Sequence, residues 1–321
     1  MIAHKITSHK KGENFMLQYK KLVVCTMLIT AHLCGNNVNY ISFDIGMKVH
    51  LYPNVYEATT RVIGLNGIVL YNFFKNLYEK NISIDYHERI PKIIHQIWLD
   101  GKNGGTPTAL QPLQQSWIQH HLDRGWKYKL WTDADIEQFN LYNKQFYDAS
   151  DNFGVKADIL RWEIIYRYGG FYLDMDHECL NPLEPLLKFD FVTCLQPLDA
   201  FFVQLGAAFF GSRPGHPILK HCIETIKDDW NQKGAPKKTG PVHFTKSFYA
   251  VADKDNNYDI ALPAFYFYPL GSQDTVINKQ AWINDGAFAV HWWAKTWMPK
   301  EYRPEFSKNI HNDASAISWN D

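Results

Sequence analysis

The stretch "VKADILRWEIIYRYGGFYLDMD", residues 155–176, joins a helix pattern directly to a strand pattern. From 155 to 168 apolar residues recur on one helical face, and Gly169 and Gly170 stop the helix. The apolar, aromatic run "FYLDMD" that follows predicts a buried strand that ends in two carboxylates. Side chains two apart on a strand point to the same face, so we expect Asp174 and Asp176 to converge there.

The same alternation of strand and helix extends on both sides of this stretch. Upstream, "PKIIHQIWLDG" predicts a strand, "ALQPLQQSWIQHHLDRG" a helix and "WKYKLWT" a second strand. Downstream, we expect strands at 191–195, 206–212 and 261–270 and a helix at 216–230. Strand, helix, strand predicts an α/β domain with a parallel sheet. No repeat or low-complexity tract interrupts residues 91–298, which we therefore interpret as one domain.

The N-terminal part has a different character. Residues 22–34 are mostly apolar and follow Lys20 and Lys21, which is the layout of a secretory signal or a short signal anchor. The run is shorter than the roughly 20 residues that a membrane span needs. We expect residues 1–35 to be a signal peptide or short membrane anchor, which predicts a secretory route or membrane association. Residues 36–90 are then a stem or N-terminal extension with one packing helix, and residues 299–321 a C-terminal tail.

Charge and cysteine usage exclude some classes of function. Lysine and arginine total 33, as do aspartate and glutamate, so the sequence gives no electrostatic argument for a nucleic-acid partner. The five cysteines lack the spacing of a zinc site. Aromatic residues gather beside the polar motifs, where they suit sugar rings and nucleobases, although ordinary core packing is the alternative for each of them.

Two carboxylates placed close together need a counter-charge. A divalent cation with oxygen ligands, Mn²⁺ or Mg²⁺, would supply it and would bridge the carboxylates to substrate phosphates. The alternative is a solvated acidic turn. Asp158 and Arg161, three apart on the preceding helix, share a face and can present a carboxylate and a guanidinium to a ligand. The alternative interpretation of Asp158 and Arg161 is an ordinary ion pair within the helix that binds no ligand.

Several segments taken together resemble one enzyme family. These are "IPKIIHQIWLDG", "KADILRWEIIYRYGGFYLDMD", "ECLNPLEPLL", "RPGHPIL", "TGP" and "AVHWWAKTW". They resemble the glycosyltransferases with the DXD sugar-binding motif, family 32, which includes mannosyltransferases and bacterial capsular polysaccharide enzymes. The resemblance covers roughly residues 90–298 and implies a GT-A, Rossmann-like nucleotide-diphospho-sugar transferase fold for a catalytic domain at 91–298.

The resemblance also implies an activity. It predicts metal-dependent transfer of a hexose from a nucleotide-diphosphate sugar, GDP-mannose or a UDP-hexose, to a glycan, lipid or protein acceptor, with retention at the anomeric carbon. The cofactor would be Mn²⁺ or Mg²⁺. The leaving phosphate would take the acceptor's proton, and we assign no residue as general base or nucleophile. Membrane association, if any, would run through residues 22–34.

The roles of individual residues follow from the same resemblance. Trp98 matches the aromatic that stacks on the nucleobase, although a core position is the alternative. Asp158 and Arg161 match the pair that grips the donor sugar, next to Gly170 and Tyr172 of the "GGFYLDMD" motif. Asp174 matches the acid that contacts the ribose and the sugar and reaches the metal through water. Asp176 matches the direct metal ligand, and His291 matches a further metal ligand. Trp292 or Trp297 matches an indole donor to a phosphate oxygen.

The sequence departs from the family at one place and leaves two alternatives open. Gly206, Ala207 and Ala208 stand where many members carry an Asn, which puts an acceptor-side amide contact in doubt. A haloacid dehalogenase-type phosphatase also places D-x-D after an apolar strand and uses the first Asp as nucleophile. The other alternative is a non-catalytic sugar-nucleotide-binding protein of the same fold.

Overall fold

The computed structural model describes residues 40–52, 66–101, 105–200, 202–254, 257–272, 274 and 276–294. The apolar run 22–34, Trp297 and the predicted tail 299–321 lie outside the described residues. From Ser42 onward the described residues belong to one compact unit. Among the described residues, no helix has the length and apolar character needed to cross a bilayer.

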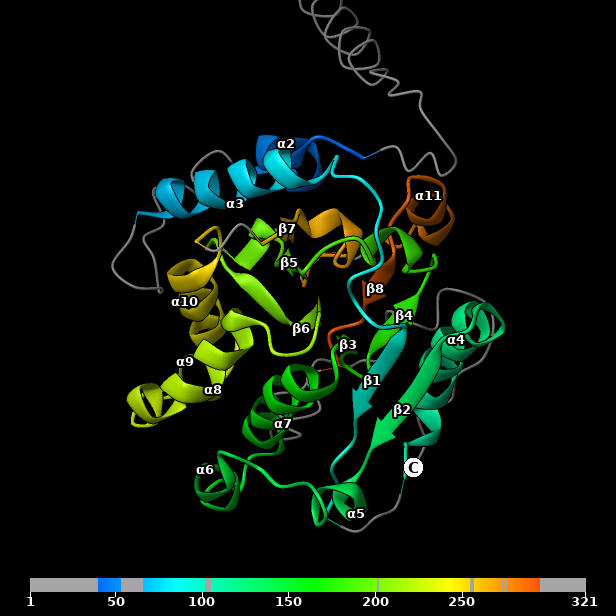
Figure 1. Cartoon of the computed structure of the whole chain (residues 1–321). Coiled ribbons are helices and arrows are strands. Elements are labelled where there is room, and N and C mark those ends of the chain that lie inside the picture. Colours follow the sequence, from blue (N-terminus) through cyan, green and yellow to red (C-terminus); the bar gives the residue numbers. More distant parts are fainter. Residues whose placement is uncertain are drawn as a thin grey trace, which may run out of the picture. The chain divides into compact units, whose positions relative to one another are not determined.

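The centre of this unit is a six-stranded sheet with the strand order β2-β1-β3-β6-β5-β7 (Figure 1). Its strands are β1 (Ile93–Ile97), β2 (Lys127–Trp131), β3 (Gly170–Leu173), β5 (Phe191–Leu195), β6 (Leu205–Ser212) and β7 (Asp259–Leu262). Strand β1 is parallel to β2 and β3, and β5 is parallel to β7. Only β6 runs antiparallel to its two neighbours in the sheet. The predicted α/β class with a mostly parallel sheet is confirmed.

Helices connect and cover the strands. They are α2 (Phe43–Gly46), α3 (Gly67–Asn81), α4 (Gln111–His121), α5 (Asp133–Ile136), α6 (Lys144–Asp148), α7 (Phe153–Tyr168), α8 (Pro217–Asp229), α9 (Ala235–Lys238), α10 (Pro241–Val251) and α11 (Lys279–Asn284). The helices predicted at 155–168 and 216–230 correspond to α7 and α8. The strand predicted at 261–270 ends early, because β7 stops at Leu262 and a 3-10 turn, Ala264–Tyr266, follows Pro263.

The DXD motif lies in a turn and not on a strand. Strand β3 ends at Leu173, and a second, two-stranded sheet begins at His177 with β4 (His177–Cys179) paired antiparallel to β8 (Ala289–His291). The His177 amide donates to the Asp174 carbonyl at 3.1 Å, which closes the turn between β3 and β4. The expectation that Asp174 and Asp176 share one face of a strand is therefore wrong, and the two side chains have separate surroundings.

The two glycines at the junction of α7 and β3 are required by packing. Gly170 has a φ of +95°, and a Cβ there would lie 2.5 Å from the Ile93 carbonyl oxygen of β1. Gly169, also at positive φ, would place a Cβ 2.7 Å from Pro214. Close approach of β3 to β1 explains Gly170 without a bound ligand, so its placement among donor-binding residues gains no support from this geometry.

The helix within the predicted N-terminal extension packs on the sheet. Helix α3 lies against β7, and its residues Leu70 and Phe74 are fully buried. The Asn81 side chain at its end donates to the Asp259 carbonyl at 2.7 Å and is 2% exposed. The Asn-Ile-Ser sequence at residues 81–83 is therefore closed to glycosylation in the folded protein.

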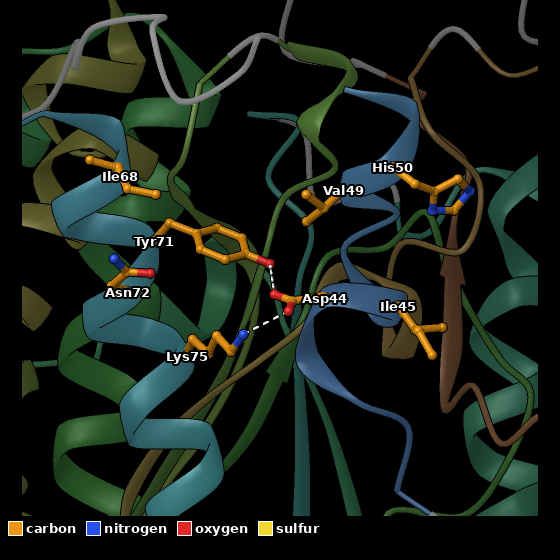
Figure 2. A pocket seen from close by; sticks show the side chains of 8 residues that line it. All are labelled: Asp44, Ile45, Val49, His50, Ile68, Tyr71, Asn72 and Lys75. Carbon is orange, nitrogen blue, oxygen red and sulfur yellow. Dashed lines mark hydrogen bonds and ion pairs between the residues drawn. The ribbon is translucent and has the colours of Figure 1, made fainter. Parts of the chain in front are cut away.

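A surface pocket next to α3 is separate from the predicted site. It lies between α2, the 3-10 turn Val49–Leu51 and α3 (Figure 2), where Tyr71 and Lys75 both bind the carboxylate of Asp44, at 2.7 and 2.6 Å. The residues that line it are Asp44, Ile45, Val49, His50, Ile68, Tyr71, Asn72 and Lys75. None of them belongs to the predicted donor or metal set.

Candidate active site

The predicted site residues gather where β1 and β3 end. Trp98 directly follows β1, and Asp174 directly follows β3. Ligands of open α/β sheets bind at the carboxyl ends of the strands, so this is the expected edge of the sheet. Asp158 and Arg161 approach the same place from α7, whose N-terminus is capped by Asn152 through a bond from the Val155 amide at 3.1 Å.

Arg161 joins the helix to the end of β3. Its Nη2 lies 3.3 Å from Asp158 Oδ1 and 3.3 Å from Asp174 Oδ1. Its Nη1 donates to the Ala207 carbonyl of β6 at 2.6 Å, and its guanidinium carbon lies 4.5 Å from the centre of the Tyr172 ring. The Tyr172 hydroxyl completes the network by donating to Asp174 Oδ1 at 2.6 Å. Both acids therefore share one buried cation.

Burial sets the protonation of this network. Asp158 is buried, which raises the pKa of its carboxyl to about 6 despite the opposing charge of Arg161 and a 2.8 Å bond from Thr239 Oγ1. Burial works against the charge of Arg161, yet Asp174, Tyr172 and Asp158 together hold the pKa of the guanidinium above its ordinary value. The site thus presents a permanent cation beside a carboxyl that ionises near neutral pH.

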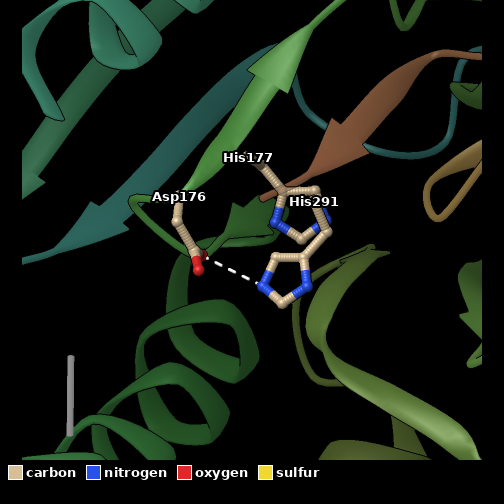
Figure 3. A group of neighbouring side chains, drawn as sticks. All are labelled: Asp176, His177 and His291. Carbon is tan, nitrogen blue, oxygen red and sulfur yellow. Dashed lines mark ion pairs between the residues drawn. The ribbon is translucent and has the colours of Figure 1, made fainter. Parts of the chain in front are cut away.

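A second group forms around the other acid of the motif. Asp176, His177 and His291 each offer a ligand atom, and these atoms lie within 4.8 Å of one another (Figure 3). His291 Nε2 is 3.0 Å from Asp176 Oδ1, and the Ala294 amide donates to Asp176 Oδ2 at 2.8 Å. Because β4 pairs with β8 so that His177 lies opposite His291, the two imidazoles stack with their centres 4.5 Å apart.

The donor set of this group fits a divalent cation. Burial alone would raise the pKa of Asp176, but the neighbouring His291 holds it below its ordinary value, so the carboxylate is ionised. Burial also holds the pKa of His177 well below its usual range, which leaves a neutral imidazole able to bind a metal. Within the described residues, His177 Nδ1, His177 Nε2 and His291 Nδ1 are buried without a hydrogen-bond partner. One carboxylate with two imidazoles can hold a divalent transition metal such as Mn²⁺.

The structure divides the predicted metal set. It brings Asp176 and His291 together, and it holds Asp174 against Arg161 and Tyr172 instead. Both contacts engage Oδ1 of Asp174, so this acid is oriented by Arg161 and Tyr172 and not by His291. Tyr172, 2% exposed, orients Asp174 rather than offering a free surface to a ligand.

The tryptophans fall into three situations. Trp98 is half-buried against the apolar cluster that contains Met175 and Trp282, and its Nε1 has no partner among the described residues. Trp292 belongs to that cluster, and its indole donates to Glu178 Oε2 at 3.2 Å. The role of Trp292 as a phosphate donor is therefore not supported, since its N–H is already bound inside the protein. Trp297 lies outside the described residues.

Sequence reasoning missed His177, Tyr268 and Thr239. His177 directly follows the DXD motif, but only the pairing of β4 with β8 shows that it faces His291. The Tyr268 ring meets the edges of both imidazoles, at 5.6 and 5.5 Å between centres. A Cβ at Gly206 would lie 2.0 Å from the Tyr268 hydroxyl, so Tyr268 fills the space that a side chain at 206 would take. The position of Tyr268 explains why residue 206 is a glycine in the segment where many family members carry an Asn.

Comparisons with known proteins agree with this geometry. Residues 107–192 match the family described as "Glycosyltransferase sugar-binding region containing DXD motif". An uncharacterized glycosyltransferase of Acanthamoeba polyphaga mimivirus is 28% identical over 187 residues, which cover 56% of this chain and 73% of that protein. Inositol phosphoceramide mannosyltransferase 1 of Schizosaccharomyces pombe is 32% identical over 147 residues. The match covers 43% of this chain and less than half, 43%, of that enzyme.

Among solved structures, the PaToxG glycosyltransferase aligns with a TM-score of 0.42 at 15% identity, over 57% of this chain and 77% of that one. The family match itself spans α4, β2, α7, β3 and the DXD turn, which carry Asp158, Arg161, Asp174 and Asp176. This match favours a glycosyltransferase over a haloacid dehalogenase-type phosphatase. Over residues 107–192 the chain therefore matches the glycosyltransferases with a DXD sugar-binding motif.

Proposed function

We propose that this protein transfers a hexose from a nucleotide-diphosphate sugar in a metal-dependent reaction that retains the anomeric configuration. The observation that carries the proposal is the juxtaposition of two groups: the Arg161 network with its two carboxylates, and the buried pair of Asp176 and His291. One group can bind sugar hydroxyls, and the other can hold a cation for the diphosphate.

In this proposal each residue has a separate task. Asp158 accepts hydrogen bonds from donor hydroxyls, while Arg161 fixes Asp158 and Asp174 in place. Trp98, at the end of β1, stacks on the nucleobase. Asp176 and His291 hold the cation, Mn²⁺ or Mg²⁺. When bound, the cation stabilises the negative charge of the leaving diphosphate.

Retention then needs no protein nucleophile. Tyr172 and Arg161 orient Asp174 through its Oδ1, and we assign this acid no nucleophilic role. We propose that the acceptor hydroxyl attacks the anomeric carbon from the face that the phosphate leaves. The departing phosphate oxygen takes the hydroxyl proton, so the bond to the nucleotide breaks as the new glycosidic bond forms.

For the substrates, we propose GDP-mannose as donor, with a UDP-hexose as the alternative, and a lipid acceptor ahead of a glycan or a protein. The support is the similarity to an inositol phosphoceramide mannosyltransferase, over less than half of that enzyme's length. We also propose that residues 22–34 direct the chain to the secretory route or attach it to a membrane.

A panel of sugar nucleotides tests the donor assignment. The protein is heated with Mn²⁺ and each of GDP-mannose, UDP-glucose, UDP-galactose and UDP-N-acetylglucosamine, and the melting temperature is recorded, since a ligand that binds the native state raises it. GDP-mannose should give the largest rise, and the rise should shrink in Asp158→Asn. Exposed Asp148, paired with Lys144 on α6, supplies the control Asp148→Asn, which should behave as wild type. Stabilisation by none of the four donors would overturn the proposed function.

A further inference from the structure

His177 is a buried histidine for which the protein provides no hydrogen-bond partner. Its side chain is fully buried, and neither ring nitrogen has a partner within the described part of the chain. A neutral imidazole carries one donor and one acceptor nitrogen, and each buried polar atom left unpaired costs about 1–3 kcal/mol. Such an atom in a native protein calls for an explanation, and a bound ion is one.

The surroundings hold His177 in a fixed position. Strand pairing places it opposite His291, with the rings stacked at 4.5 Å, and Tyr268 closes against the edges of both. The Trp293 ring packs edge-on against His291 at 4.4 Å and donates its indole N–H to the Leu270 carbonyl at 3.0 Å. Both imidazoles are therefore oriented by packing before any ligand arrives.

We propose that His177 is a third protein ligand of the metal, so that Asp176, His177 and His291 form a preassembled site of one carboxylate and two imidazoles. Their ligand atoms already lie within 4.8 Å of one another. The inference rests on the proposed function for the use of the metal, but the site itself can be tested without any donor or acceptor.

Two properties distinguish this site from a carboxylate pair that binds a cation together with a nucleotide. First, three protein ligands hold the cation in the absence of nucleotide, whereas one or two carboxylates depend on substrate phosphates to complete the shell. Second, imidazole nitrogen favours Mn²⁺, Co²⁺ and Zn²⁺ over Mg²⁺, which keeps oxygen ligands and water. The site should therefore discriminate strongly against Mg²⁺.

The test measures metal binding directly on the full chain. The protein is stripped with a chelator and titrated with Mn²⁺ without nucleotide, and free Mn²⁺ is followed by its electron paramagnetic resonance signal. Co²⁺ replaces Mn²⁺ in a second titration, in which the visible absorption bands report nitrogen ligation. We expect one tightly held ion per chain and no displacement by a large excess of Mg²⁺.

The variant His177→Phe keeps a ring in the stack but removes both nitrogens. It should lose at least about tenfold in Mn²⁺ affinity and change the Co²⁺ bands, because even outer partners of metal ligands cost 10–100-fold when removed. The control His120→Phe replaces a half-buried histidine of α4, whose Nδ1 lies 2.8 Å from the Ser116 carbonyl oxygen, and should bind metal as wild type. Circular dichroism of both variants checks the fold, and His177→Gln replaces His177→Phe if the latter unfolds.

Unchanged Mn²⁺ affinity and unchanged Co²⁺ bands in a folded His177 variant would overturn the inference. Failure of the wild-type protein to bind Mn²⁺ without nucleotide would do the same, even if sugar nucleotides are turned over. Conversely, tight metal binding that depends on His177, without any turnover of sugar nucleotides, would support the metal site and contradict the proposed function.

Discussion

Asp158 combines deep burial with a neighbouring cation, and burial dominates. Its pKa, raised to about 6 from 3.8, means that the carboxyl is protonated at pH 5 and ionised at pH 7. Only the ionised form balances the charge of Arg161. Since we propose that Asp158 binds the donor, we expect donor binding to depend on pH in a range where ordinary aspartates do not titrate.

From this we predict that the KM for the donor falls as the pH rises from about 5 to about 7. In Asp158→Asn the KM should be higher throughout and should lose this pH dependence. Steady-state kinetics at saturating metal measure both. A wild-type KM that is flat across the range would show that Asp158 does not titrate there.

The same shift predicts an opposite trend for stability. A carboxyl whose pKa is higher in the folded state stabilises the fold below its unfolded pKa, and this contribution is lost as the pH rises through about 6. The shift corresponds to on the order of 3 kcal/mol. Urea unfolding should show the wild type losing stability relative to Asp158→Asn between about pH 4 and about pH 7. A constant difference between the two proteins would contradict the raised pKa.

At the scale of elements, the junction of α7 and β3 positions both acids of the network. The helix places Asp158 and Arg161, the two glycines reverse the chain against β1, and β3 then delivers Asp174. A Cβ at Gly170 would meet the Ile93 carbonyl at 2.5 Å in addition to the strain of a φ of +95°. Gly125 has a φ of +81°, but a Cβ there would have no atom within 4 Å. A substitution at Gly125 therefore introduces backbone strain without a steric contact and serves as the control for Gly170.

We accordingly predict that Gly170→Ala destabilises the protein clearly more than Gly125→Ala. The latter should cost about 1–3 kcal/mol, the range for backbone strain alone. Gly170→Ala adds the displacement of β1, and donor binding should weaken with it. Free energies of unfolding from urea titrations measure the difference. Equal losses for the two variants would mean that contact between β3 and β1 is not what requires a glycine.

Local patterns were sufficient to predict α7, its stop and the parallel core of the sheet. The apolar periodicity of residues 155–168 and the double glycine depend only on neighbours in sequence. The position at which β3 ends depends on residues distant in sequence. The Asp174 amide donates to the Ala208 carbonyl of β6, and the chain then turns into β4. His177 was missed for the same reason, because its partner His291 comes more than a hundred residues later.

The indole of Trp292 could not be assigned from sequence either. Its bond to Glu178 crosses between β8 and β4, and Lys279 of α11 binds the same carboxylate. The resemblance alone placed Asp158, Arg161, Asp174 and Asp176 correctly near one another. It also implied Asp176 and His291 at the metal and Asp174 toward ribose and sugar. What it could not supply was the contact of Arg161 and Tyr172 with Asp174, because that contact depends on tertiary packing.

At the scale of the whole molecule, α3 extends the folded unit beyond the predicted catalytic domain. Phe74 is fully buried where α3 packs on β7, and its ring lies 5.8 Å from that of Phe248 on α10. Val69 of the same helix is 47% exposed. The helix thus contributes to the core on one face only.

We predict that Phe74→Ala lowers the free energy of unfolding by about 3–5 kcal/mol, as for a buried phenylalanine. Val69→Ala should change it by less than about 0.5 kcal/mol. Unfolding should remain a single transition in both. If Phe74→Ala instead produced a separate early transition with the rest intact, α3 would be an independent segment.

We propose that this chain uses its DXD turn to hold a cation for sugar transfer. The most direct test of this proposal is release of nucleotide from GDP-mannose, or from the donor that the panel selects, by wild-type protein and by Asp176→Asn, with Mn²⁺ and with a chelator. Turnover should require the metal and fall at least about 100-fold in Asp176→Asn, the order of loss when one charge-stabilising group is removed. Asp148→Asn should retain wild-type turnover. Undiminished, metal-independent turnover in folded Asp176→Asn would contradict the account.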